Sequence, residues 1–251
     1  MPELNNIWKE IKALQDKAKH INCMWNEQSK DKYELIEEYS IEQQIKYAKS
    51  KLIDLAIERI LDEYDVKNVS ISDKDKESFK EKDFDENAIK EHIVENYIKK
   101  ADELAFKEIL SRARELVPRF WKDYEPRKPT IDDIVKNKKL VLRVYWYFEH
   151  LDWNTIQSLN ALEKLMYVVV MNTRPSQAEA RIGKILNIMR DSQGYAQARH
   201  YIYVNGVIDS FRIYKNGKAE FRFHKEEDAK KVAEVLLSEN INYDEIKSRR
   251  D

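Results

Sequence analysis

Tyrosines and basic residues alternate near the end of this chain. The segment from 201 to 222 holds seven such side chains, namely Tyr201, Tyr203, Arg212, Tyr214, Lys215, Lys218 and Arg222. Aromatic rings can stack on nucleic-acid bases, and cations can pair with phosphates. The pattern therefore predicts a surface that binds nucleic acid or a protein partner. The alternative is that N-terminal helices cover this face and bury the tyrosines as amphipathic core.

A second basic and aromatic group lies in a stretch of the chain that contains three prolines. Its members are Arg119, Trp121, Arg127 and Lys128. Because proline ends helices, this stretch is a natural boundary. We expect a mostly helical region over 1–117 and a mixed α/β region over 118–251, and the two can also pack as one domain.

Two carboxylates near the same segment suggest a different chemistry. Asp209 and Glu220 lie on neighbouring predicted strands, and paired carboxylates can hold Mg²⁺ for phosphodiester cleavage. A metal-dependent nuclease is therefore an alternative, although the expected register puts the two on opposite faces. The five histidines show no paired metal spacing, and no phosphate-binding loop, dinucleotide motif or nucleophile elbow occurs. We expect no catalytic residue, metal or cofactor.

Two Asn-Gly pairs predict the elements that position these residues. Asn-Gly is a strong hairpin signal, because both residues tolerate positive φ. In the first hairpin, a two-residue turn would pair Val204 with Val207 and Ile202 with Asp209. In the second, the best register has a three-residue loop over 215–217, with pairs Ile213–Ala219, Phe211–Phe221 and Arg212–Glu220, and with Gly217 in the left-handed conformation.

The predicted meander has two distinct faces. One collects apolar residues, and the helix expected over 226–238 packs on it; these residues are Ile202, Val204, Val207, Phe211, Ile213, Ala219, Phe221 and Phe223. The other carries the tyrosines and cations, together with Ile208 and Ser210. Residues 139–148 are a further strand candidate, and Ser176 with Glu179 predicts a capping box that begins a helix reaching about Arg190.

The N-terminal part reads as helix. Apolar residues recur at alternating steps of three and four, at Leu4, Ile7, Ile11, Leu14, Ala18, Ile21 and Trp25. This heptad seam fits either a hairpin with the next helix or a coiled coil with another chain, and so a homo-oligomer. Residues 73–85 are expected to form an exposed loop or frayed helix start, followed by one long helix over 86–116. The fold class is therefore α+β, with an N-terminal helical hairpin or bundle before a region that ends in a three-stranded antiparallel meander and a packing helix.

Charge is balanced overall but unevenly distributed. The net charge is −1, yet residues 61–110 hold 15 acidic against 9 basic residues, and residues 174–225 hold 10 basic against 4 acidic. An acidic surface that inhibits a protein or imitates nucleic acid is therefore a further alternative. One cysteine and no long apolar run indicate a cytoplasmic protein with no membrane partner.

The hairpin motif also supports a family resemblance. The run from Phe211 to Phe223, F-R-I-Y-K-N-G-K-A-E-F-R-F, is followed by a charged helix. It resembles an uncharacterised bacterial family carried on plasmids and prophages, which has an F-x-x-x-K-N-G hairpin near its end and some members with a methyltransferase-like annotation. The likeness extends over about 85–237. It implies a mobile-element setting, in which a small protein often acts by binding a host or phage factor. We therefore expect a non-enzymatic accessory protein of a phage or plasmid that binds nucleic acid or a protein complex and modulates an antiviral defence system.

Overall fold

The computed structural model describes residues 3–28, 36–122, 125–147, 150–193, 201–204 and 206–248. The fold is α+β, as predicted: helices come first, and an antiparallel sheet with a packing helix follows. The chain divides into two compact units, one of Met1–Val66 with Ser70–Lys100 and one of Lys67–Val69 with Ala101–Asp251. The boundary predicted near residue 117 falls within the second unit.

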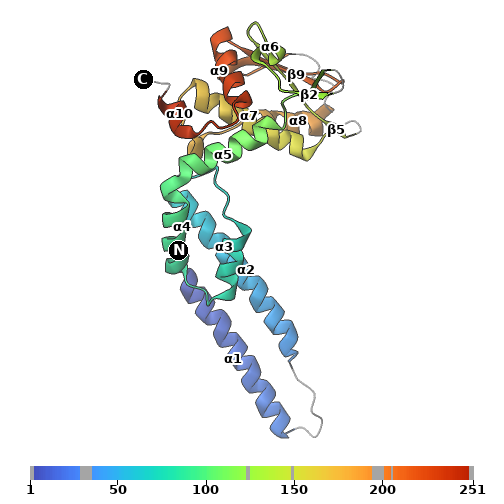
Figure 1. Ribbon diagram of the computed structural model, residues 1–251. Helices are drawn as coiled ribbons and strands as arrows, with labels where there is room; N and C mark the ends of the chain where they lie inside the picture. Colours follow the sequence, from blue (N-terminus) through green and yellow to red (C-terminus); the bar gives the residue numbers. More distant parts are fainter. Residues whose placement is uncertain are drawn as a thin grey trace. The chain divides into compact units, whose positions relative to one another are not determined.

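The first unit is helical. It contains α1 (Leu4–Gln28), α2 (Glu38–Glu63), α3 (Asp73–Glu81), α4 (Glu86–Asn96) and the short 3₁₀ helix η1 (Ile98–Lys100). Helices α1 and α2 run side by side as a hairpin (Figure 1). Ser72 and Asp85 cap α3 and α4, because their side chains accept hydrogen bonds from backbone N–H groups of the first turns.

Two helix predictions in this part need correction. The single helix expected over 86–116 is divided into α4, η1 and α5 (Ala101–Arg114), and the α-helix breaks at Tyr97. There the Tyr97 hydroxyl donates to Asp75 and accepts from the Ser72 N–H, so the ring is held by the start of α3. The heptad seam is also only half right, since Leu4 and Ala18 are buried whereas Leu14, Ile21 and Trp25 are exposed.

The second unit is built on a five-stranded antiparallel sheet. Its strands are β3 (Val135–Lys136), β4 (Lys139–Arg143), β7 (Ile202–Tyr203), β8 (Ile208–Ile213) and β9 (Lys218–Phe223), in the order β3-β4-β9-β8-β7. Two small hairpins stand apart from it, β1 (Phe120–Lys122) with β2 (Glu125–Arg127), and β5 (Trp146–Tyr147) with β6 (His150–Leu151). The remaining helices are α6 (Ile131–Ile134), α7 (Trp153–Val170), the 3₁₀ helix η2 (Pro175–Gln177), α8 (Ile182–Gln193), α9 (Glu226–Leu237) and α10 (Tyr243–Ser248).

The second Asn-Gly hairpin has the predicted register. Arg212 lies opposite Glu220, Phe211 opposite Phe221 and Ile213 opposite Ala219. Gly217 has φ +82°, the left-handed conformation expected of it. The meander β7-β8-β9 is therefore confirmed, and β4 adds a further strand beside β9.

The first hairpin has a different register. Ile202 lies opposite Phe211 and Tyr203 opposite Ser210, and the Val204 N–H donates to the Asp209 carbonyl. The predicted two-residue turn is therefore wrong, and the loop is longer. The pairing of Ile202 moves by two residues, from 209 to 211, so this side chain keeps its predicted face.

A β-bulge between Ile208 and Ser210 explains a second difference. Ile208 pairs with Phe223, whereas Ser210 pairs with Arg222, so one extra residue is inserted in β8. Ile208, predicted on the tyrosine face, is buried in the core instead. The ladder alternates as predicted only beyond the bulge.

The core lies between the sheet and its helices. Leu140, Phe211, Phe221 and Phe223 are fully buried on one face of the sheet, and α9 packs against β4 and β9 there, as expected (Figure 1). Helix α7 is also largely buried and contacts α9. Because neighbouring side chains along a strand alternate in direction, the residues between these core positions project from the opposite face.

Candidate functional site

The face of the sheet opposite the core carries basic side chains from four strands. We call it the cationic face and define it by Lys136, Lys139, Arg143, Arg212, Lys218 and Arg222. On β4 these residues alternate with buried Leu140 and Leu142, and on β9 they alternate with buried core residues. The alternation comes directly from the two-residue period of a strand, so the sheet places cations from different strands side by side.

Glu220 is the anchor at the centre of this face. Its side chain is only 6% exposed, and its carboxylate accepts from the Tyr201 hydroxyl at 2.7 Å and from the amines of Lys218 at 2.6 Å and Lys139 at 3.3 Å. Burial opposes the charged form. The hydrogen bonds from these three residues and from Tyr214 outweigh it and lower the pKa of Glu220 to about 2. The carboxylate therefore stays ionised and fixes the orientation of four neighbours.

Arg212 lies among the aromatic rings beside this anchor. Its guanidinium carbon is 4.3 Å from the centre of the Tyr214 ring and 5.7 Å from that of Tyr201. Lys218 and Lys139 lie over the same two rings, at 5.2 and 5.5 Å. Within the described part of the chain, the buried Nε of Arg212 has no hydrogen-bond acceptor, and cation–π attraction to the two rings stabilises the guanidinium.

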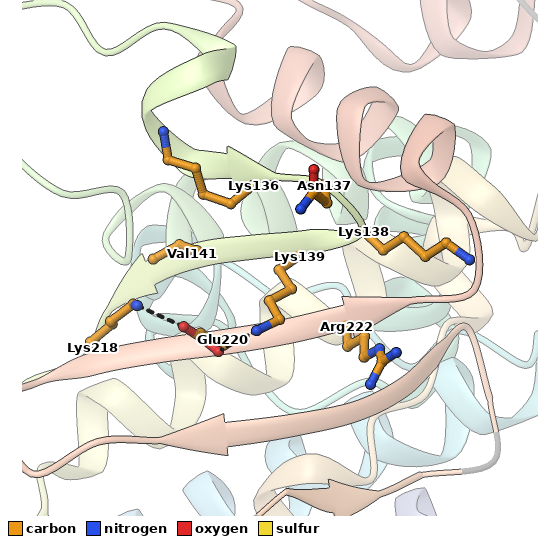
Figure 2. A pocket seen from close by; sticks show the side chains of 8 residues that line it. All are labelled: Lys136, Asn137, Lys138, Lys139, Val141, Lys218, Glu220 and Arg222. Carbon is orange, nitrogen blue, oxygen red and sulfur yellow. Dashed lines mark hydrogen bonds and ion pairs between the residues drawn. The ribbon is translucent and has the colours of Figure 1, made fainter.

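A shallow pocket opens on the same face. It has a volume of about 550 Å³ and is lined by Lys136, Asn137, Lys138, Lys139, Val141, Lys218, Glu220 and Arg222. Figure 2 shows Lys139 and Lys218 directed toward Glu220, with Arg222 farther along β9 and Lys138 at the turn between β3 and β4. Asn137 has φ +55°, which closes this tight turn and places Lys138 at the rim. Five of the lining residues are cationic and one is acidic.

A family model matches about three quarters of the chain. Residues 50–240 match the family described as a domain of unknown function, DUF4942. The chain belongs to this family. The match covers α4, α5, the whole sheet and α9, and therefore includes the cationic face. No curated protein and no solved structure matches the chain.

The predicted surface residues differ in how the structure uses them. Tyr203 is 73% exposed at the edge strand β7, and Lys215 is exposed in the β8–β9 loop. Tyr201 and Tyr214 are half-buried, with hydroxyls directed to Glu220 and cations over their rings. Of the three tyrosines that were expected to stack on bases, Tyr203 is thus the most accessible one.

The second predicted group lies on and beside the small β1–β2 hairpin, where Phe120 pairs with Arg127 and Trp121 with Pro126. Arg119 is exposed, whereas Arg127 forms a two-fold ion pair with Asp133 at 2.6 and 2.7 Å and lies 4.9 Å from the Phe120 ring. Lys128 pairs with Glu239. The side chain of Trp121 lies outside the described residues. The ion pair of Arg127 with Asp133 stabilises the local fold, since Asp133 also completes the capping box of α6.

The bulge changes the placement of the two carboxylates considered for a nuclease. Asp209 lies 3.9 Å from the Nε of Arg222, the cation two residues after Glu220 on β9. Asp209 therefore approaches the cationic face, which corrects the prediction that it points to the opposite side. Both carboxylates are paired with cations, and no three His, Cys, Asp or Glu residues gather as a metal site in the part of the chain that the structure describes.

Sequence reasoning missed the contribution of β3 and β4. Lys136, Lys138, Lys139 and Arg143 were not among the predicted site residues. The signal was present, because Lys139, Val141 and Arg143 alternate with leucines, the pattern of a strand with one buried face.

No helix among the described residues is long and apolar enough to span a membrane.

Proposed function

We propose that the chain binds nucleic acid along its cationic face and reads mainly the phosphate backbone. The observation that carries this proposal is the 550 Å³ pocket, where five cationic residues surround a single carboxylate. Glu220 neutralises only part of the positive charge that lines the pocket, through its ion pairs with Lys139 and Lys218. The pocket therefore keeps a net positive charge that can bind an external anion. Phosphates are the anions that such clustered lysines and arginines bind in nucleic acids.

Preorganisation supports the same proposal. Lys139 and Lys218 are held by Glu220, and Arg212 is held between two tyrosine rings. Binding to cations that are already fixed costs less side-chain entropy of the protein than binding that must first order mobile lysines. The face is therefore better suited to binding than a surface with the same charge on mobile side chains.

The engaged tyrosines limit what the surface can read. Tyr201 and Tyr214 already hold cations over their rings, so Tyr203 is the side chain available for stacking on a base. With one stacking position and many phosphate contacts, affinity depends little on sequence and strongly on salt.

The resemblance supplies a setting for this activity. We place the protein in the bacterial cytoplasm as a non-enzymatic accessory factor of a phage or plasmid, where nucleic-acid binding serves to modulate an antiviral defence system. Support comes from the K-N-G hairpin at Lys215–Gly217 and its basic surroundings. A host or phage protein complex with an acidic surface is the competing partner that experiments must distinguish.

The test is fluorescence anisotropy with labelled oligonucleotides. Single-stranded DNA, single-stranded RNA and duplex DNA are titrated with the protein and with the double variant Arg143→Ala/Arg222→Ala. Both residues are exposed, so the fold is expected to persist. Removing a cation that binds a phosphate weakens the complex, and we expect a reduction of about tenfold or more for two cations.

The matched control is Lys107→Ala, which removes an exposed cation of α5. It should bind like the unmodified protein. Absence of binding to all three oligonucleotides, or an equal reduction in the control, would contradict the proposal and favour a protein partner. Cleavage of the oligonucleotides with Mg²⁺ or Mn²⁺ present would favour the nuclease alternative instead.

A further inference from the structure

Helix α1 carries an apolar stripe that its own hairpin leaves uncovered. Leu14 is 63% exposed and Ile21 is 42% exposed, and Ile7 on the same stripe is half-buried. The three residues are separated by seven positions, so they lie in one line along the helix. Trp25, which is 41% exposed, extends the apolar surface beyond Ile21.

The neighbouring side of α1 is already occupied. Leu4, Trp8, Ala18 and Asn22 are buried in the first unit, where α2 packs on α1. Asn22 holds the segment just before α2 against α1, because its side chain bonds both the N–H and the carbonyl of Ile36, at 2.9 and 2.8 Å. Trp8 also lies against Phe84 and donates to Asp83, and the Leu4 N–H donates to Glu86, so α2 and the segment 83–86 together cover this side. The line of residues 7, 14 and 21 is more exposed.

The open stripe has a symmetry that points to its partner. Read in either direction from Leu14, it presents an isoleucine seven residues away, at Ile7 and at Ile21. The outer flank of the stripe carries Glu10 on one side of Leu14 and Lys17 on the other, and both are exposed. The sequence of this surface is thus complementary to itself when one copy is turned around.

We propose that two copies of the chain associate through antiparallel α1 helices, with the two-fold axis at Leu14. In this arrangement Leu14 meets Leu14, Ile7 meets Ile21, and Glu10 of each copy faces Lys17 of the other. Two opposite-charge pairs therefore flank a core of three apolar rungs. A closed two-fold contact of this kind is the commonest form of homo-oligomer.

A parallel arrangement does not use these features. In parallel coiled coils, the outer flank of one helix faces the opposite flank of the other, which here contains Trp8 and Asn22. Those positions are buried by the hairpin. Only the antiparallel arrangement places the outer flanks against each other, so charge complementarity selects the orientation as well as the partner.

Sedimentation equilibrium of the full chain tests the association. The unmodified protein should be a dimer that dissociates on dilution, and Leu14→Asp should be monomeric, because it buries two carboxylates at the axis. The control Asp16→Lys alters a charge on the side of α1 that faces away from the stripe, and it should leave the dimer unchanged. Circular dichroism checks that each variant keeps its helices. A monomer at every concentration would overturn the proposal.

A charge exchange tests the pairing. Glu10→Lys or Lys17→Glu alone should weaken the dimer by roughly fivefold or more, since two attractive pairs become repulsive. The double variant Glu10→Lys/Lys17→Glu should restore the original affinity. Single variants without effect, or a double variant weaker than both, would contradict the proposed contact.

Cysteine crosslinking tests the orientation in a Cys23→Ser background. Leu14→Cys should form a disulfide-linked dimer, because the two positions meet at the axis. Ile21→Cys should not, because residues 7 and 21 lie about 21 Å apart along a helix and each residue 21 faces residue 7. Crosslinking of Ile21→Cys to itself would show a parallel dimer and overturn the proposal.

Discussion

At the scale of single residues, the cationic face depends on one carboxylate. Glu220 is buried, yet four hydrogen-bond donors keep it ionised, so its pKa is lowered to about 2. The group is an anchor that aligns Lys139, Lys218, Tyr201 and Tyr214. Its removal would release these side chains and leave the buried part of the face without its negative charge.

Acid titration of stability measures this anchor. A carboxyl whose pKa is lowered on folding stabilises the folded state above its unfolded pKa, roughly 4.3, and this stabilisation is lost as the pH falls toward about 2. The lysine partners are 37% and 43% exposed, so we expect about 2 kcal/mol after screening.

Urea unfolding of Glu220→Gln should therefore show a loss of about 2 kcal/mol at pH 7 that shrinks as the pH approaches 2. Glu179→Gln is the control, because Glu179 forms an exposed ion pair with Lys67. A Glu220→Gln protein as stable as the unmodified one at pH 7 would show that the anchor does not stabilise the fold.

Part of this site could be predicted from sequence. The pairing of Arg212 with Glu220 followed from the hairpin register, because a three-residue loop was the one that put apolar residues on a common face. Lys139 and Arg143 could not be assigned to the site in this way. Their strand pairs with β9 across about 80 residues of chain, and no local signal specifies such a contact.

At the scale of elements, the β8–β9 turn shows why the motif contains glycine. Gly217 has φ +82°, and a Cβ there would lie 2.7 Å from the carbonyl oxygen of Val144. The same residues are joined by a hydrogen bond from the Val144 N–H to the Gly217 carbonyl, at 2.7 Å. The turn thus approaches the segment after β4 closely, which leaves no room for a side chain.

Gly217→Ala should destabilise the second unit by about 1–3 kcal/mol, since both the left-handed conformation and the contact with a backbone atom oppose a side chain. Lys215→Ala in the same loop is the control, because Lys215 is exposed and its substitution requires no backbone change. Thermal unfolding would compare the two. Equal stability would mean that the turn relaxes without cost.

The start of α8 shows what local sequence cannot reveal. Ser176 and Glu179 predicted a capping box, but the helix begins at Ile182, and Glu179 pairs with Lys67. The cap comes from α7, where buried Glu163 accepts from the N–H groups of Arg181 and Ile182, at 2.6 and 2.8 Å. Burial raises the pKa of Glu163 despite these bonds. A cap from a different helix leaves no signature next to the helix that it caps.

At the scale of the whole molecule, charge separation matters more than net charge. The chain has a net charge of −1, yet residues 174–225 hold 10 basic against 4 acidic residues, and residues 61–110 hold 15 acidic against 9 basic residues. In the acidic segment, α3 has Asp73 and Asp75 in its first turn and no buried residues. The idea that this segment imitates nucleic acid stays a prediction, whereas the cationic face has a defined geometry.

The salt dependence of oligonucleotide affinity tests the central claim most directly. Binding to phosphates releases counterions, so the logarithm of the association constant should fall linearly with the logarithm of the salt concentration. Replacement of Lys138, Arg143 and Arg222 by alanine should reduce the slope by roughly one for each phosphate that is no longer bound, and Lys107→Ala should leave it unchanged. An affinity that does not change with salt, or a slope that the triple variant shares with the unmodified protein, would contradict nucleic-acid binding at this face.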